Sequence, residues 1–282
     1  MIAKPIQAIE EWLPIWGLKR VPFTADEKGL FISDSHGQII DALNTAALLR
    51  TVILLTGLPG TGKSSLLKYW LSGLDQKRTL PILITQASLS ASGVLEMLLS
   101  KLGLRPAFKR SANLIALERH LKSIDPTTLI LVLDDAQNYP APALEEIRML
   151  LGMGNSQRSA FSLVLSGEDY LLGSLQMSAQ QALFSRISLA VELKTLTAEE
   201  IQPYLLWHVS HAGLNKDIFA TAAIDLLRES SSGNPRTLNL LAQCAWMCAA
   251  RLGGCTIEGS HVLSAINQVP SAKAKIDPQK LG

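Results

Sequence analysis

The segment Gly57-Leu-Pro-Gly-Thr-Gly-Lys63-Ser64 decides the fold of this chain. It has the spacing G-x-x-x-x-G-K-[ST], in which glycines let the backbone turn tightly so that successive amide hydrogens point at phosphate oxygens. Lys63 can then reach the β- and γ-phosphates of a nucleotide, and the Ser64 hydroxyl can ligate Mg²⁺. The candidate nucleotide-binding residues are Gly57, Pro59, Gly60, Thr61, Gly62, Lys63, Ser64 and Ser65.

The flanking sequence has the pattern that such a loop requires. Thr51–Thr56 is an apolar strand pattern, and Ser64–Leu74 has apolar residues at helical spacing. The positive N-terminal end of that helix favours an anion. A short pattern can also mark a mere strand-to-helix turn, but flanking elements of this kind favour the nucleotide site.

Five short apolar segments predict a parallel sheet. Helical patterns lie between them, and this alternation is typical of a sheet covered on both faces. After Leu193 the strand pattern stops, and Thr197 with Glu200 is a plausible capping box that opens a helical region. The predicted strands are Thr51–Thr56, Leu80–Gln86, Leu129–Leu133, Phe161–Ser166 and Ser188–Leu193.

We therefore predict an α/β fold, with a core built on a five-stranded parallel sheet and a small C-terminal, all-helical lid domain. The predicted boundaries are 1–48 for an N-terminal lead and first helix, 49–194 for the α/β core, 195–269 for the lid and 270–282 for a flexible tail. The tail prediction rests on its lysines and prolines.

Composition indicates a globular chain, because 48% of residues are hydrophobic and 18% are charged. No apolar run approaches the roughly 18 residues that a membrane span needs, and Glu10 and Glu11 interrupt any secretory signal. We expect no membrane span and a cytoplasmic location. The net charge of +2 neither demands nor excludes nucleic acid. The cysteines, Cys244, Cys248 and Cys255, are expected to be reduced thiols.

A second motif, Leu129-Ile-Leu-Val-Leu-Asp134-Asp135, ends an apolar strand with two carboxylates. Asp134 is placed to hold the Mg²⁺ shell, which is the role of the Walker B aspartate in P-loop ATPases. In these ATPases the glycine-rich segment is called the Walker A motif. Most such ATPases have Glu next, whereas this chain has Asp135, which is one methylene shorter. We expect Asp135 to be the catalytic carboxylate of a slow or partner-stimulated ATPase. The alternative is that Asp135 only caps the following turn.

Two later segments resemble the AAA+ superfamily. Gly233-Asn-Pro-Arg236 resembles its sensor-2 stretch, which implies that Arg236 senses the γ-phosphate. Ala182-Leu-Phe-Ser-Arg186-Ile resembles the segment with the arginine finger, which implies that Arg186 completes a neighbouring subunit's site. The alternatives are a helix cap and a surface salt bridge, respectively. Ser166 stands where a polar sensor-1 residue is expected.

The chain resembles ExeA-like ATPases, which include a general secretion pathway ATPase and the target-selection ATPases of transposons. The N-terminal segments that carry this resemblance are Trp16-Gly17-Leu18, Pro22-Phe23, Leu30-Phe31 and Ser35-His36. Later segments that match the same family are Leu144–Arg148, Phe161–Gly167, Leu196–Glu200 and Gly233–Leu241. The resemblance covers roughly residues 12–268. It implies that the lead packs on the adenine side and that Pro22 and Phe23 contact the base. The departures are Asp135 for Glu, and Leu58-Pro59 where Glu is common.

The resemblance also implies ATP and Mg²⁺ as cofactors and a homo-oligomer, either a ring or a filament. As in the transposon group, the chain is expected to assemble on duplex DNA with ATP and to recruit or activate a transposase. The alternative is a soluble assembly ATPase of a secretion or type IV pilus system with a protein client. Arg105, Lys109 and Arg110 are the candidate DNA contacts, although an ordinary solvated loop explains them equally well.

Overall fold

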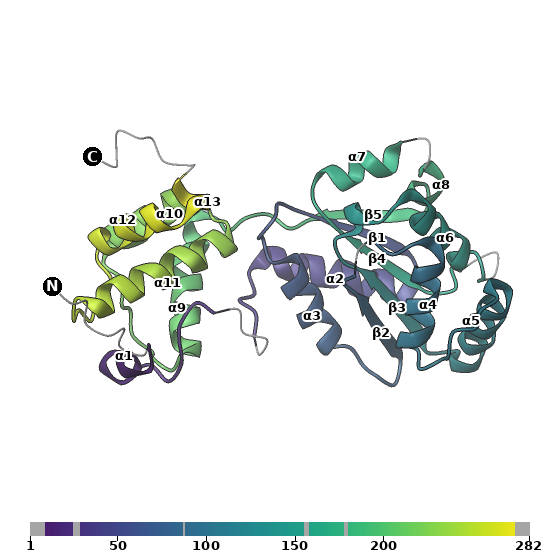
Figure 1. Ribbon diagram of the computed structural model, residues 1–282, viewed down its shortest axis with the longest axis horizontal. Helices are drawn as coiled ribbons and strands as arrows, with labels where there is room; N and C mark the ends of the chain where they lie inside the picture. The colour runs from purple at the N-terminus through teal and green to yellow at the C-terminus, as the bar shows by residue number, and fades with distance from the viewer. Residues whose placement is uncertain (1–8, 25–28, 87, 155–157, 178–179, 274–282) are drawn as a thin grey trace. The chain divides into compact units, whose positions relative to one another are not determined.

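The five predicted strands form one parallel sheet in the computed structural model, which describes residues 9–24, 29–86, 88–154, 158–177 and 180–273 (Figure 1). Their order across the sheet is β2-β3-β4-β1-β5. The predicted five-stranded parallel sheet is confirmed. The strands are β1 (Val52–Thr56), β2 (Thr79–Ile84), β3 (Thr128–Leu133), β4 (Ser162–Ser166) and β5 (Ile187–Glu192).

Helices cover both faces of the sheet because alternate strand residues point to opposite sides. In β3, Leu131 and Leu133 pack in a core with helices α4 (Ala91–Lys101) and α6 (Ala141–Leu151), whereas Val132 faces the other side. Helix α2 (Asp34–Leu49) lies on that other side, where the Ser162 hydroxyl donates to the Ala46 carbonyl oxygen at 3.2 Å. The remaining elements of this unit are α3 (Lys63–Ser72), α5 (Arg110–Ile124), the 3₁₀ helix η1 (Ala136–Asn138), α7 (Tyr170–Gln176) and α8 (Gln181–Phe184).

The C-terminal region is helical, as predicted. Helix α9 begins with the predicted capping box, in which the Thr197 amide donates to the Glu200 carboxylate at 2.8 Å. Fully buried aliphatic and aromatic residues, among them Leu205, Leu241 and Trp246, form the core of this helical unit. Its C-terminal helices are α9 (Ala198–His211), α10 (Thr221–Ser231), α11 (Pro235–Arg251), α12 (Gly259–Gln268) and α13 (Pro270–Lys273).

The N-terminal lead divides between two compact units. The described residues of Met1–Phe31 belong to the helical unit together with Gly60–Gly62 and the chain from Thr195, whereas Ile32–Pro59 and Lys63–Lys194 form the α/β unit. Trp12 and Trp16 of α1 (Ile9–Trp16) pack edge-on against Trp246, with ring centroids 6.1 and 6.4 Å apart. The predicted segment 1–48 thus contributes α1 to one unit and α2 to the other.

The predicted tail, residues 270–282, begins with ordered structure. Helix α13 continues from α12, and Ala272 is fully buried in the helical core. A small apolar residue at this position fits the core, although the lysines and prolines around it indicate a solvated segment. The rest of the tail, residues 274–282, lies outside the described residues.

Candidate nucleotide site

The phosphate-binding loop has the backbone that its glycines were expected to allow. Gly60 and Gly62 have φ angles of +87° and +103°, in a region that side-chain-bearing residues rarely adopt. Lys63 begins α3, and its ammonium group donates hydrogen bonds to the carbonyl oxygens of Gly57 at 2.7 Å and Leu58 at 3.1 Å. The loop and the first turn of α3 therefore place the predicted lysine directly beside the predicted glycine-rich backbone.

Burial lowers the pKa of Lys63, whose side chain is 8% exposed, and four nearby carboxylates oppose that shift. Among the four, Glu168 has the largest effect, followed by Asp134, Asp169 and Asp135. The ammonium group therefore lies in an acidic setting at the end of the central strands. Such a setting suits a site that binds a magnesium-complexed polyphosphate, because the cation balances part of the negative charge.

Asp134 and Ser166 meet at the ends of neighbouring strands. The β3–β4 register places Leu133 beside Leu165, and the Ser166 hydroxyl donates to Asp134 Oδ1 at 2.9 Å. The amide of Asp135 donates to the same oxygen at 3.1 Å. Both side chains are buried, at 4% and 0% exposure. The two bonds fix the orientation of a carboxylate that the sequence predicts to be a metal ligand.

Asp135 has an unusual backbone for a residue other than glycine. Its φ is +51°, its side chain is exposed, and it precedes η1 without capping that helix through its side chain. The only hydrogen bond that the structure gives its carboxylate, within the described part of the chain, is a long one of 3.4 Å from Gln137 Nε2. The predicted alternative of a simple turn cap therefore has no side-chain bond in support.

The residues present fit Mg²⁺ in their chemistry, because Ser64 and Asp134 offer the hard oxygen donors that this ion prefers. Ser64 is exposed, whereas Asp134 is held in place by two hydrogen bonds. No group of three or more His, Cys, Asp or Glu side chains among the described residues forms a metal cage. That arrangement is typical of Mg²⁺ sites that rely on substrate phosphates and water for the remaining ligands.

Sequence reasoning missed Gln137 and Glu168. Gln137 links two segments, because its side-chain oxygen accepts a hydrogen bond from the Glu168 amide at 3.2 Å while its nitrogen faces Asp135. Glu168 follows β4 by two residues. The available signal was their position, since polar residues directly after two adjacent parallel strands gather at one edge of the sheet.

The two predicted AAA+ arginines lie in different units. Arg186, half-buried before β5, lies near Glu145, whose pKa is lowered by hydrogen bonds from Arg148 and further by the charge of Arg186. The structure gives Arg186 no ion pair among the described residues. Arg236 is exposed in the first turn of α11, and its amide donates to the Gly60 carbonyl oxygen at 3.2 Å within the helical unit.

The segment Gly233-Asn234 also forms a helix cap, which was the alternative interpretation of that motif. The Asn234 side chain accepts a hydrogen bond from the Thr237 amide at 3.2 Å. A cap and a phosphate-sensing arginine are compatible, because the cap fixes where α11, and therefore Arg236, begins. The sensing role stays a prediction.

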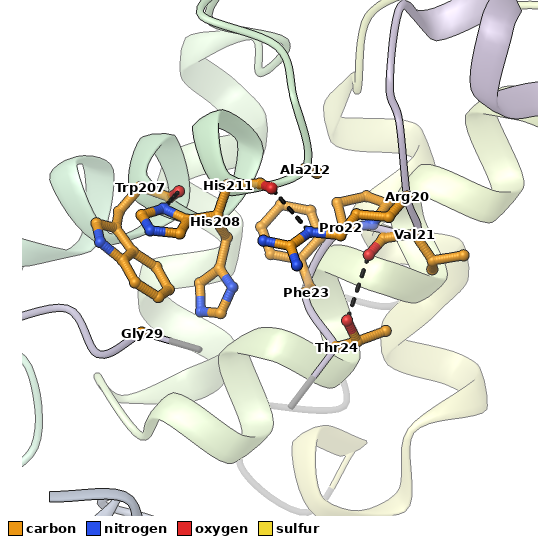
Figure 2. A pocket seen from close by; sticks show the side chains of 10 residues that line it. All are labelled: Arg20, Val21, Pro22, Phe23, Thr24, Gly29, Trp207, His208, His211 and Ala212. Atoms are coloured by element: carbon orange, nitrogen blue, oxygen red, sulfur yellow. Dashed lines mark hydrogen bonds between the residues drawn. The ribbon is translucent and has the colours of Figure 1, made fainter. Parts of the chain in front are cut away.

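Pro22 and Phe23 lie in the wall of a small pocket in the helical unit (Figure 2). Phe23 and Pro22 are both buried, and the centroid of the Phe23 ring lies 5.6 Å from that of His208. Burial, and to a lesser extent the charge of His211, lowers the pKa of His208 to about 4. The cavity volume is about 10 Å³, room for one water molecule. Contact with adenine by Pro22 and Phe23 stays a prediction.

The candidate DNA-binding loop joins α4 to α5. Arg105, Phe108 and Lys109 lie in this loop, and Phe108 is exposed over its whole surface. Arg110 has a different role, because its guanidinium makes two hydrogen bonds of 2.8 and 3.1 Å to the buried carboxylate of Glu146 in α6. All three predicted side chains are exposed, and Arg110 is the one that is paired with a carboxylate, that of Glu146.

No helix within the described residues is long and apolar enough to cross a membrane.

Comparison with known proteins shows which families and structures the chain is similar to. Residues 48–175 match the family described as the AAA domain. The chain is 26% identical over 269 residues to General secretion pathway protein A of Aeromonas hydrophila, a match that covers 90% of this chain. The chain spans about half of that relative, 48% of its length. The predicted resemblance is thereby confirmed.

Solved structures share the fold. The ORC2 protein of Aeropyrum pernix, in ADPNP and ADP complexes, has a TM-score of 0.67 at 15% identity, covering 95% of this chain and 73% of that one. Cdc6p of Pyrobaculum aerophilum has a TM-score of 0.64 at 19% identity, covering 91% and 70% of the two chains. The RuvB Holliday junction branch migration motor of Thermotoga maritima has a TM-score of 0.55 at 18% identity, covering 88% and 73%. The predicted P-loop fold of AAA+ ATPases is confirmed.

Proposed function

We propose that this AAA-domain chain is an ATP-dependent regulator of DNA transposition. With ATP and Mg²⁺ it assembles on duplex DNA, as a ring or a filament, and recruits or activates a transposase. The observation that carries this proposal is a concentration of positive charge on the α4–α5 region, residues 101–122, which we call the basic region. The basic region contains six lysine and arginine residues and one acidic residue, although the whole chain has a net charge of only +2.

The basic region has the features of a surface that tracks a phosphate backbone. Arg105 and Lys109 extend into solvent from a loop that is held on both sides. Before Phe108, the buried Asn113 side chain bonds to both the amide and the carbonyl oxygen of Ala107, at 2.7 and 3.0 Å. After it, Arg110 is tied to Glu146. Cations on an ordered loop bind phosphates with a smaller loss of conformational entropy than cations on a loose one.

A structural likeness and a sequence resemblance support DNA and a transposase as partners. The ORC1 protein of Aeropyrum pernix, solved in complex with DNA, shares the fold with a TM-score of 0.63 at 17% identity. The transposase follows from the resemblance to ATPases of transposons, in which the ATP-bound form acts on DNA. ATP hydrolysis then releases the assembly and resets it.

In this proposal Lys63, Ser64 and Asp134 hold MgATP, and Asp135 is a carboxylate that orients the attacking water. Because Asp135 is short and, within the described residues, is held only by the long bond from Gln137, turnover is slow or depends on a partner. Arg236 senses the γ-phosphate, and Arg186 reaches the nucleotide of a neighbouring subunit. ATP binding thus drives assembly, and assembly permits hydrolysis.

A second candidate is an assembly ATPase of a secretion or type IV pilus system. The match to General secretion pathway protein A favours it, although the chain corresponds to only 48% of that protein. In this case the client is a protein, and assembly requires nucleotide but not DNA.

Light scattering separates the two candidates. The protein is sized with a non-hydrolysable ATP analogue and Mg²⁺, with and without duplex DNA. Large assemblies that form only with both components support the transposition regulator, whereas equal assembly without DNA supports the protein-directed ATPase. The Arg105→Ala/Lys109→Ala variant is expected to bind DNA more weakly and to lower the salt slope of log Kd by about 2.

Lys77→Ala/Arg78→Ala is the matched control, because it removes the same two residue types from an exposed part of the same unit. It should bind DNA as the unchanged chain does. Equal losses in both variants would mean that the basic region has no special role and would contradict the proposal.

A further inference from the structure

The end of β4 and the two residues that follow it lie beside the predicted catalytic groups. Strand β4 lies between β1, which leads into the phosphate-binding loop, and β3, which leads to Asp134. The Gly167 amide donates to the Leu55 carbonyl oxygen of β1 at 3.0 Å, and Ser166 bonds to Asp134. Residue 168 therefore leaves the sheet at the carboxyl ends of the central strands, the edge where parallel α/β sheets bind ligands.

The backbone at Glu168 is fixed by Gln137. The Glu168 amide donates to Gln137 Oε1 at 3.2 Å. This contact requires glycine at position 167, because a Cβ there would lie 2.5 Å from that oxygen and 2.5 Å from Leu171. The same Gln137 side chain faces Asp135 through its nitrogen. One amide side chain thus holds the Glu168 backbone and the Asp135 carboxylate in one assembly.

The Glu168 carboxylate differs from the Asp135 carboxylate in burial and in reach. It is half-buried, whereas Asp135 is exposed, and its side chain is one methylene longer. Its charge acts on the Lys63 ammonium group, as do the charges of Asp134, Asp169 and Asp135. Lys63 is the side chain expected to contact the γ-phosphate, and Glu168 follows β4 at the same edge of the sheet as Asp134 and Asp135.

We propose that Glu168 is a further catalytic residue, whose carboxylate, together with Asp135, orients the water that attacks the γ-phosphate. The inference rests on the proposed ATP hydrolysis. In that step the water oxygen bonds to Pγ while the bond from Pγ to the bridging oxygen breaks. The electron pair of that bond leaves on ADP, and the proton of the water passes through the Glu168 carboxylate to solvent. Asp135 fixes the second hydrogen of the water.

The test compares Glu168→Gln with Glu96→Gln in the full chain. Both variants remove one negative charge by the same substitution, but Glu96 is exposed on α4 and is not among the carboxylates that act on Lys63. With MgATP and duplex DNA present, Glu168→Gln should lower kcat at least 100-fold, in the range of a lost general base. Glu96→Gln should stay within about twofold of the unchanged chain. Equal thermal stability of the two variants shows that the loss is not one of folding.

A binding measurement tests the same placement without turnover. Removal of a charge facing the γ-phosphate should tighten binding of a non-hydrolysable ATP analogue about threefold to fivefold relative to ADP. Asp135→Glu placed in the Glu168→Gln chain should restore part of kcat, because glutamate at position 135 supplies the missing reach. The partial recovery would identify the two carboxylates as partners in one task.

Three results separate the two proposals. An unchanged kcat in Glu168→Gln overturns the role of Glu168 and leaves the ATPase proposal standing. If the unchanged chain hydrolyses no ATP under any condition, the ATPase proposal fails, and the binding ratio decides the placement of Glu168. An unchanged ratio of ATP-analogue to ADP affinity would then overturn that placement.

Discussion

Gly233 is the residue whose replacement should damage the helical unit most. Its φ is +71°, and a Cβ there would lie 2.1 Å from the Leu196 carbonyl oxygen. The two chain segments also exchange a bond, in which the Leu196 amide donates to the Gly233 carbonyl oxygen at 2.9 Å. Any side chain must therefore separate these segments. We expect Gly233→Ala to lower the free energy of unfolding of this unit by about 3 kcal/mol or more.

Gly253→Ala provides the matched control. Gly253 has a similar φ of +73°, but a Cβ there would meet nothing within 4 Å. Its replacement should cost only the conformational term, about 1 kcal/mol. Denaturant unfolding followed by the fluorescence of the tryptophans in this unit measures both. Similar losses in the two variants would show that the contact with Leu196 is not what requires glycine.

At the same scale, the residues found from the sequence are those whose motif defines their role. Lys63 and Asp134 follow a fixed spacing or end an apolar strand, so chemistry and position are visible together. Gln137 and Glu168 carry no such spacing. Their proximity exists only because β3 and β4 are neighbours in the sheet although they are not joined by a short turn. Strand order is a tertiary property that local patterns do not encode.

At the scale of elements, the loop between α4 and α5 should depend on Asn113. This side chain is 3% exposed, and it forms hydrogen bonds with both the amide and the carbonyl group of Ala107. In Asn113→Ala both bonds are lost, at a cost of about 1–2 kcal/mol. We expect amide hydrogen exchange across residues 102–109 to accelerate about 10-fold or more, because the loop then opens locally.

Asn215→Ala, at a position of the helical unit outside its helices, is the control for that measurement. It should leave exchange across residues 102–109 unchanged. If Asn113→Ala also leaves it unchanged, the order of the loop comes from elsewhere, such as the ion pair between Arg110 and Glu146. DNA affinity measured on the same variants would then show whether loop order contributes to binding.

Elements were predictable where one face of the chain is continuously apolar. All five strands belong to this class, as does α9 with its capping box. The packing of the N-terminal lead was not predictable in this way, because α1 buries Trp12 and Trp16 against Trp246. That residue lies more than two hundred positions away in the chain. Helix α13 was missed for a related reason, since Ala272 alone enters the core and a single alanine gives no periodic signal.

At the scale of the whole molecule, the residues with roles in the proposed mechanism belong to both compact units. The α/β unit holds Lys63, Asp134 and Glu168, and the helical unit holds Arg236. Arg186 has no ion pair among the described residues and lies beside Glu145 near the start of β5. An arginine without such a pair in the described part of its own chain is available to a second copy.

Arg186→Ala should therefore retain nucleotide binding and lose hydrolysis by roughly 100-fold or more, since a trans-acting arginine stabilises transition-state charge. Mixing separates action in trans from action within one subunit. Lys63→Ala subunits are expected to be inactive because they cannot hold the phosphates, yet they still carry Arg186. Combined with Arg186→Ala subunits, they should restore part of the ATPase activity, because each intact nucleotide site then has an arginine from its neighbour. Light scattering shows whether the mixtures are assembled. If assembled mixtures show no recovery, Arg186 acts in its own subunit's site. If Arg186→Ala alone keeps full turnover, Arg186 has no role in catalysis.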